Sequence, residues 1–456
     1  MTTTTEHEDD VRPGRQKLNV TLAVLATLPG LLLGLAILFH LPHPELAPPV
    51  EALIFGVAVV GAAFILSWGA EVAQLDISAG LAIAVLALIA VLPEYAVSFV
   101  FAWQGGTAVA NSPTGSCEVP GGENPCSLVL ANMTGANRLL IGVGWAMVVI
   151  IAWFRLRRAG TPKDGIELPR SSAVEVSFLA IATLYSLSLP FKKTITLIDM
   201  VILVAIFIAY TIRISKAPPE EPHLIGPAAW VGTFSVRARR ITVGGFFLYS
   251  AIVILLSAEH FAQGLVETGT ELGINSFFLV QWLAPLASEA PELLVAGLYA
   301  WRLWVTNGLT TLISSKVNQW TLLIGTLPLV FAISSRSLNG LPVDSHQSAE
   351  LLLTAAQSLF AVAILFNLHM SIWEALVLLG LFLTQFVLGA VLPALMDLPE
   401  NTELRIVAGI YLVLALFLFA RGRRTIVPIL KDGFRTPYSE LDARDEAEHR
   451  AVTDRS

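Results

Sequence analysis

The sequence is short of charged residues and of cysteines. Only 14% of its 456 residues are charged, against about 25% in soluble globular proteins, which argues against an ordinary soluble enzyme. No basic stripe with interleaved aromatic residues occurs, so nucleic-acid binding has no support. No nucleotide-binding motif occurs either, which leaves an ATP-driven machine unsupported.

Apolar residues dominate instead. They make up 55% of the chain, and the mean hydropathy is +0.70. A helix needs about 20 apolar residues to cross a bilayer. We therefore predict an all-α polytopic membrane protein with about twelve transmembrane helices, at 18–41, 50–70, 79–104, 128–154, 171–189, 194–212, 241–262, 275–301, 309–334, 349–367, 371–395 and 404–420.

Lysines and arginines in the loops predict the orientation of these helices. With a cytoplasmic N-terminus, most basic residues near helix ends fall on the cytoplasmic side, in agreement with the positive-inside rule. Both termini are then cytoplasmic. Because no organelle signal is recognised, we expect a multi-pass protein of the plasma membrane. The acidic ends of the chain are expected to be solvated.

The two cysteines lie in one predicted extracellular loop, 105–127. The spacing between Cys117 and Cys126 suits a disulfide within this loop, in an oxidising compartment. The alternative is two unrelated free thiols.

Four landmarks recur in the same order in the two halves of the chain. They are an acid at the end of a helix, a Pro-Glu pair, a polar stretch on the next helix and an acid near the start of a later helix. The pairs are Gly69-Ala70-Glu71 with Ser257-Ala258-Glu259, Pro93-Glu94 with Pro291-Glu292, Asn132–Asn137 with Thr311–Lys316, and Asp199 with Glu374. Five predicted helices separate each landmark from its counterpart, and an odd number reverses the direction across the membrane. The halves are therefore predicted to be two inverted five-helix repeats.

Inverted repeats with discontinuous helices are typical of secondary transporters. Pro93 and Pro291 are expected to interrupt their helices, since proline removes a backbone hydrogen bond and clashes with the preceding turn. Glu94 and Glu292 then lie near mid-membrane, where a carboxylate is costly and indicates function. The predicted segments are a cytoplasmic N-terminal tail (1–17), an extra transmembrane helix (18–41), repeat 1 (50–215), a cytoplasmic linker (216–240), repeat 2 (241–395), a second extra helix (404–420) and a cytoplasmic acidic tail (421–456).

These motifs resemble those of the calcium/cation antiporter superfamily, which includes the sodium/calcium exchanger membrane region family. The resemblance covers about residues 50–395. It implies an integral membrane antiporter that exchanges Ca²⁺ or a related cation for Na⁺ or H⁺ by alternating access. It implies no enzymatic activity and no resident cofactor, with inorganic cations and the lipid bilayer as the partners.

The resemblance also implies a set of ion ligands. The two Pro-Glu carboxylates, Glu94 and Glu292, would bind the metal ion. Neutral ligands would come from Ser288 before the second pair and from polar residues on the next helices, here Asn132, Asn137, Ser315 and Gln319. The alternative for Asn132 and Asn137 is a role as polar groups in helix packing. Repeat 1 departs from the family pattern, because the expected polar positions hold Ala90, Val91, Ala136 and Leu140.

Two charged residues depart from the pattern in repeat 2. Glu289 stands where serine is expected, and Lys316 stands where asparagine is expected. Glu289 and Glu292 share a helix face, so their protonation should be coupled. Lys316 is either a tethered cation, part of a proton relay or only the partner of Glu289. We therefore expect proton-coupled exchange at least as readily as sodium-coupled exchange.

Other functions stay open at this point. One is Na⁺/H⁺ exchange without calcium, and another is a transport-dead sensor or scaffold, which the lost hydroxyls of repeat 1 would explain. An intramembrane metalloenzyme would call for histidine ligands, and no histidine lies near either Pro-Glu pair. Glu71, Glu259, Asp199 and Glu374 are expected to be structural, and Arg138 is expected to be a boundary anchor. The transported ion, the stoichiometry and the oligomeric state are not fixed by the sequence.

Overall fold

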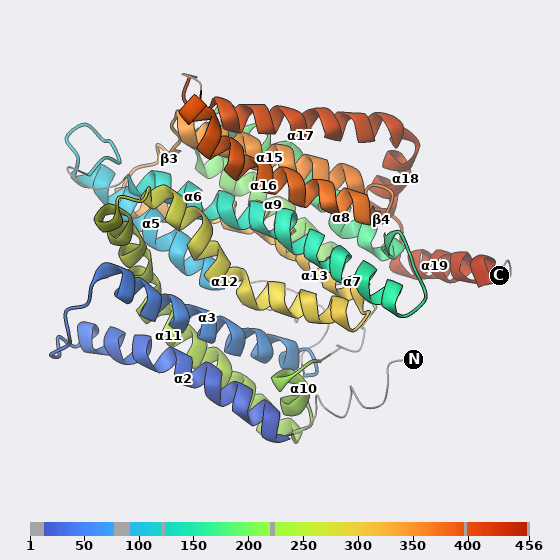
Figure 1. The fold of residues 1–456 in the computed structure, drawn as a ribbon, viewed down its shortest axis with the longest axis horizontal. Coiled ribbons are helices and arrows are strands. Elements are labelled where there is room, and N and C mark those ends of the chain that lie inside the picture. Colours follow the sequence, from blue (N-terminus) through green and yellow to red (C-terminus); the bar gives the residue numbers. More distant parts are fainter. Residues whose placement is uncertain (1–12, 77–91, 120–123, 219–223, 396–398, 454–456) are drawn as a thin grey trace. The chain divides into compact units, whose positions relative to one another are not determined.

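The computed structural model describes residues 13–76, 92–119, 124–218, 224–395 and 399–453 (Figure 1). Helices dominate these residues, as predicted. Nine helical stretches in the described ranges are long and apolar enough to cross a membrane. The other predicted runs coincide with α5 (Leu92–Asn111), α12 (Ser276–Trp301) and α16 (Ile372–Leu395). Residues 79–91 of the third predicted run lie outside the described residues.

The chain forms two compact units, and the first contains residues 1–104, 118–132 and 219–292. Its main helices are α2 (Pro13–Leu38), α3 (Pro48–Ala73) and α11 (Val236–Leu272), which pack side by side, with the short α10 (Pro227–Gly232) against α2 and α3 (Figure 1). Glycines let the helices approach: a Cβ on Gly56 would lie 2.9 Å from the ring of Phe261, and one on Gly264 would lie 3.0 Å from the backbone of Ala52. Such small-residue packing is typical of membrane helices, which gain little from hydrophobic burial inside lipid.

An ion pair joins α3 to α11 beyond the last turn of α3. Arg239 donates to both carboxylate oxygens of Asp76, at 2.7 and 2.8 Å, and Arg240 adds a bond of 3.3 Å to the same carboxylate. The Arg239 hydrogen bond holds the pKa of Asp76 below its usual range.

The second unit contains residues 105–117, 133–218 and 293–456. Its helices from the first half of the chain are α7 (Ala146–Arg158), α8 (Ala173–Ser186) and α9 (Leu197–Ile214), and those from the second half are α13 (Val305–Asn318), α14 (Ile324–Ser335), α15 (Ser345–Leu365) and α16. α17 (Thr402–Arg421) packs along α15. The helix α6 (Pro125–Leu139) enters this unit from residue 133 onward.

Two short antiparallel strand pairs connect the halves of the chain within this unit. β1 (Gly165–Glu167), before α8, pairs with β4 (His369–Ser371), before α16. β2 (Thr194–Ile195), before α9, pairs with β3 (Leu341–Pro342), before α15. The first connecting strand of each half therefore pairs with the second connecting strand of the other half. This reciprocal strand pairing is expected for two inverted repeats with the same order of helices.

The matched acids Asp199 and Glu374 cap corresponding helices. Asp199 accepts from the backbone N–H of Thr196 at 2.7 Å at the start of α9, and Glu374 accepts from the backbone N–H of Ser371 at 2.8 Å at the start of α16. Both stand three residues after the residue they cap, as in a capping box. Their expected structural role is confirmed.

The described helix that carries the second Pro-Glu pair is continuous. α12 runs from Ser276 to Trp301 with Pro285 and Pro291 inside it, so the break that we expected at Pro291 is absent. Proline is tolerated inside a membrane helix when neighbouring groups satisfy the freed carbonyl. The other predicted break precedes Pro93, and residues 77–91 lie outside the described part of the chain.

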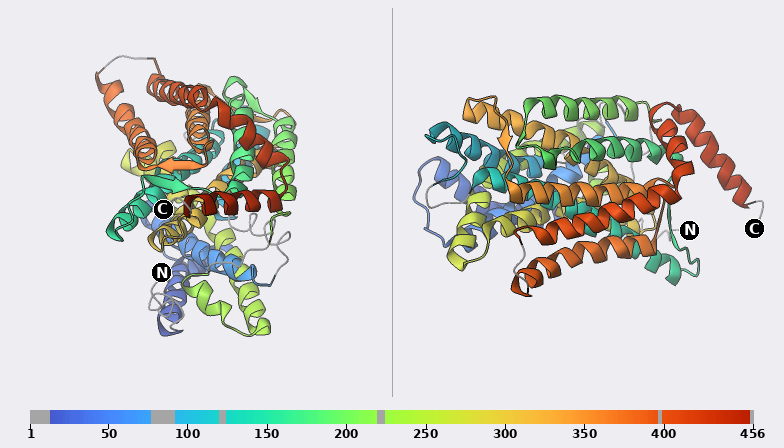
Figure 2. Two further views of the ribbon diagram at one scale, coloured as in Figure 1. Left: turned by 90° about the vertical axis from the view of Figure 1, so that its right-hand side faces the viewer. Right: turned by 90° about the horizontal axis from the view of Figure 1, so that it is seen from above.

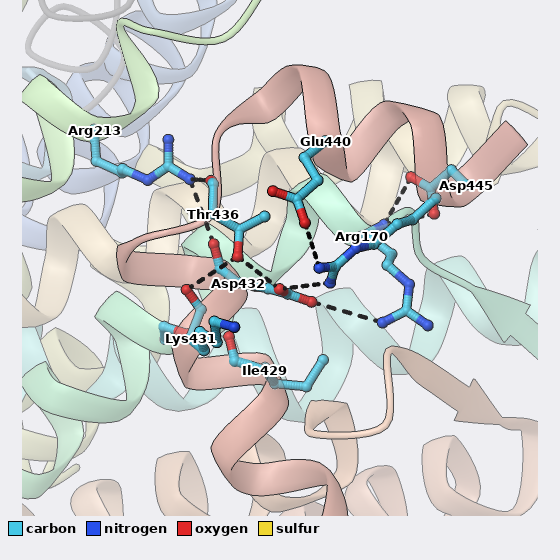
Figure 3. A network of polar contacts seen from close by, with 10 residues as sticks. Arg170, Arg213, Ile429, Lys431, Asp432, Thr436, Glu440 and Asp445 are labelled. Carbon is cyan, nitrogen blue, oxygen red and sulfur yellow. Dashed lines mark hydrogen bonds and ion pairs between the residues drawn. The ribbon is translucent and has the colours of Figure 1, made fainter. Parts of the chain in front are cut away.

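The acidic C-terminal region is helical and buries Asp432, contrary to our expectation of a solvated tail, whereas Glu440 and Glu446 are exposed as predicted. α18 (Arg423–Phe434) packs on α8, and α19 (Tyr438–Thr453) extends beyond the other helices of the unit (Figure 2). Asp432, only 2% exposed, accepts from Thr436 at 2.8 Å and Arg444 at 3.0 Å and faces Arg170 at 3.6 Å (Figure 3). Arg213, at the end of α9, donates to the carbonyl of Gly433 at 3.0 Å. These contacts replace the solvent that we expected around this acid.

The disulfide prediction is confirmed. Both Cys117 and Cys126 are disulfide-bonded, and these are the only cysteines of the chain.

Candidate ion-binding site

Glu94 lies in the first unit, in the first described turn of α5, and is only 1% exposed. Ser98 stands one helical turn further along the same face and is also buried. The side-chain amide of Asn132 donates to the Ser98 hydroxyl at 2.7 Å. The structure thus brings Glu94 and Asn132 to one face of α5. It adds Ser98, which the motif comparison missed although its spacing of four residues from Glu94 was visible in the sequence.

The other acids of the predicted site lie on α12, in the same unit. Glu289 and Ser288 are buried, and Glu292 is half-buried. Glu289 and Glu292 are separated by one helical turn, so they share a face of α12 as expected. Because residue 291 is proline, no N–H of that residue bonds the carbonyl of Ala287. Backbone carbonyls freed in this way can bind cations in transporters.

The remaining candidates lie in the second unit, on α6, on α13 and at the residue that follows α13. Lys316 is completely buried, and its ammonium donates to the backbone carbonyl of Asn137 at 2.8 Å and to its side-chain oxygen at 2.6 Å. The hydroxyl of Ser315 is buried and has no hydrogen-bond partner among the described residues, so it is available to a ligand. Gln319 is buried as well.

A π-helical segment follows each of these polar stretches. One covers Leu140–Trp145 and the other covers Gln319–Leu323. Each begins three residues after the pair that is in contact, Asn137 and Lys316. Single π-helical turns inside α-helices are frequent at functional sites. The two segments start at matched positions of the two halves, which ties the polar stretches to the internal repeat.

Arg138 is not the boundary anchor that we expected. It is 1% exposed, and its guanidinium lies 2.5 Å from the carboxylate of Glu350 on α15. It also donates to Gln385 of α16 at 3.2 Å, and Gln357 donates to its backbone carbonyl. The sequence could not reveal this cluster, because Glu350 lies far along the chain and outside both motifs.

Among the described residues, no group of three or more histidines, cysteines and acids is placed to hold a metal ion. The candidate ligands are mainly single carboxylates, hydroxyls and amides. The acids Glu94, Glu289 and Glu292 belong to the first unit together with Ser288 and Asn132, and Asn137, Ser315, Lys316 and Gln319 belong to the second.

Comparisons with known proteins identify the family. The model of the sodium/calcium exchanger protein family matches residues 49–216 and 242–391, more than half of the chain. No curated protein matches. Among solved structures, the H⁺/Ca²⁺ exchanger CAX is 40% identical with a TM-score of 0.80, and the match covers 92% of this chain and 98% of CAX. YfkE is 13% identical with a TM-score of 0.56, covering 86% of this chain and all of YfkE, which shows a shared fold. The chain therefore belongs to the sodium/calcium exchanger family of the calcium/cation antiporter superfamily, and it is a cation antiporter.

Proposed function

We propose that this antiporter exchanges Ca²⁺ for H⁺ by alternating access. The observation that carries the proposal is the pair of Pro-Glu acids, Glu94 and Glu292, of which Glu94 is almost completely buried in an apolar helix. The H⁺/Ca²⁺ exchanger CAX, 40% identical to this chain, supports calcium as the cargo and the proton as the driving ion.

The chemistry of a carboxylate pair explains why the two ions would alternate. Ca²⁺ prefers oxygen ligands and binds ionised carboxylates, so the protons must leave before Ca²⁺ can bind. Protonation neutralises the same oxygens and releases the ion. Either Ca²⁺ or protons therefore neutralise the buried carboxylates, and the two cannot be bound at once.

Within the first unit, which holds Glu94 and Glu292, the neutral ligands of the proposed site would be Ser288 and Asn132. Ca²⁺ takes six to eight oxygens, and Ala136 and Leu140 supply none from their side chains. Water would then complete the coordination shell. Sodium sites depend on hydroxyl and carbonyl oxygens, so the loss of neutral oxygens from repeat 1 weakens sodium sites most. This loss favours the proton as the coupling ion.

We further propose a plasma-membrane location with both termini in the cytoplasm. The basic residues at the ends of the helices support this orientation, and so does the disulfide at Cys117 and Cys126, which suits an oxidising exterior. We propose no resident cofactor, since the transported cations serve as substrates.

The test is ⁴⁵Ca²⁺ uptake into proteoliposomes, driven in parallel by a pH gradient and by a sodium gradient. We expect uptake under the pH gradient, and we expect Glu292→Gln to reduce it by about a hundredfold or more, as loss of an ionised ligand should. Glu259→Gln makes the same chemical change at an exposed acid of α11 and should leave uptake unchanged. Absence of calcium flux under both gradients would overturn the calcium assignment and favour Na⁺/H⁺ exchange or a non-transporting role.

A further inference from the structure

A lysine side chain is completely buried in the second unit. Lys316 of α13 has no exposed surface, although burying an ammonium costs several kcal/mol unless other groups replace its water. An intramembrane lysine is therefore expected to have a function.

Two oxygen atoms of Asn137 accept hydrogen bonds from this ammonium. The backbone carbonyl of Asn137 accepts from it at 2.8 Å, and the side-chain oxygen of Asn137 accepts at 2.6 Å. The amide nitrogen of Asn137 donates to the carbonyl of Met133 at 2.8 Å. This last bond fixes the orientation of the amide, so its oxygen points at the charge.

An aromatic face also lies close to this ammonium. The ammonium lies 4.9 Å from the ring centroid of Trp320, a distance at which a cation is attracted to the ring. Trp320 is itself buried and held by a hydrogen bond of 2.6 Å to Ser358. Two oxygens and an aromatic face form a pre-organised environment for a monovalent cation.

The position of this charge follows the internal repeat. Asn137 and Lys316 are the last residues of the two matched polar stretches, and each precedes a π-helical segment by the same three residues. One half therefore supplies the oxygens and the other half supplies the cation at equivalent places.

We propose that the ammonium of Lys316 is a tethered monovalent cation, which fills a cation position built by Asn137 and so excludes Na⁺ from it. This inference rests on the proposed antiport function and makes Lys316 a determinant of ion specificity. A covalently tethered cation cannot be released on either side of the membrane. The protein therefore needs no free Na⁺ at this position and is not driven by Na⁺ binding there.

The test replaces the tether and offers free sodium. In Lys316→Ala and Lys316→Gln, calcium uptake driven by a pH gradient should become dependent on Na⁺, rising about fivefold or more when Na⁺ replaces choline at equal ionic strength. In the wild type and in Lys316→Arg, which keeps the charge, the same replacement should have no effect. Lys193→Gln, at an exposed lysine of the same unit, is the matched control for loss of a lysine.

A second readout does not depend on transport. Because a ligand that binds the folded state stabilises it, Na⁺ should raise the Tm of the detergent-solubilised Lys316→Ala protein by about 2 °C or more relative to choline, and should not raise that of the wild type. If the wild type carries no calcium, the proposed function fails, while this measurement still decides the role of Lys316. The inference is wrong if sodium changes neither uptake nor Tm in the variants, or if neither neutral variant folds even in sodium, since Lys316 would then be purely structural.

Discussion

Acidic side chains in the apolar helices serve two kinds of role. Asp199 and Glu374 cap helices, and Glu350 pairs with Arg138. Glu94 instead stands one helical turn before Ser98, whose hydroxyl accepts from the amide of Asn132. The sequence pointed correctly to the capping acids, because their distance from the start of a helix is visible in the chain. It could not identify Glu350, whose partner lies more than two hundred residues away.

At the end of α3, Asp76 makes stability depend on pH. Its pKa is lowered by the Arg239 hydrogen bond, so the pair stabilises the fold above the ordinary aspartate pKa of about 4, and this contribution is lost as the pH falls through the lowered value. We expect Asp76→Asn to lower Tm by about 2 to 4 °C at pH 7. Thermal unfolding in detergent should show that the Tm values of the wild type and of Asp76→Asn converge as the pH falls from 7 to 3. A Tm difference of the same size at pH 7 and at pH 3 would contradict this explanation.

The buried pair of Arg138 and Glu350 is expected to be sensitive to loss of one partner. Glu350→Leu leaves the guanidinium buried without its counter-charge, which should cost about 3 to 5 kcal/mol. The double variant Arg138→Met with Glu350→Leu removes both charges and should recover most of that loss. Denaturation of the single and double variants measures the coupling. If the single and double variants are equally destabilised, the unpaired charge of Arg138 is not the cause of the lost stability in Glu350→Leu.

At the scale of helices, apolar runs predicted the secondary structure well and the irregularities poorly. All the predicted runs fall on helices where the chain is described. The break at Pro291 was predicted and is absent, whereas the π-helical segments at Leu140 and Gln319 were not foreseen. The effect of a proline on a helix depends on whether neighbouring groups satisfy the freed carbonyl, and the sequence does not show these groups. A π-helical turn has no characteristic amino-acid composition.

The C-terminal helices give a prediction at this scale. Asp432 connects Thr436 and Arg444 of the α18–α19 region to Arg170 (Figure 3). Asp432→Asn should free α19 and speed amide hydrogen exchange over 438–453 by about tenfold, with little effect on exchange in α15. Asp442→Asn removes a charge outside this network and serves as the control. Unchanged exchange in Asp432→Asn would show that α19 is held by other contacts.

At the scale of the whole molecule, the internal repeat was the strongest signal in the sequence. It led to the family, and the exchanged pairing of β1 with β4 and β2 with β3 reproduces it in the structure. Glu94 and Glu292 are candidate ion ligands because they repeat a motif in the sequence. The bond between Lys316 and Asn137 was not foreseen, because it depends on the packing of helices distant in the chain, and Ser98 was missed because it lies outside both motifs.

Calcium-driven proton movement is the sharpest test of Ca²⁺/H⁺ exchange at Glu94 and Glu292. Proteoliposomes that contain a pH-sensitive dye are given external Ca²⁺ without any other gradient. If Glu94 and Glu292 bind Ca²⁺ and protons in turn, the lumen should become more alkaline as Ca²⁺ enters, and neither Glu94→Gln nor Glu292→Gln should show this change. Calcium entry with no change in lumenal pH, or proton movement that persists in both variants, would contradict the account.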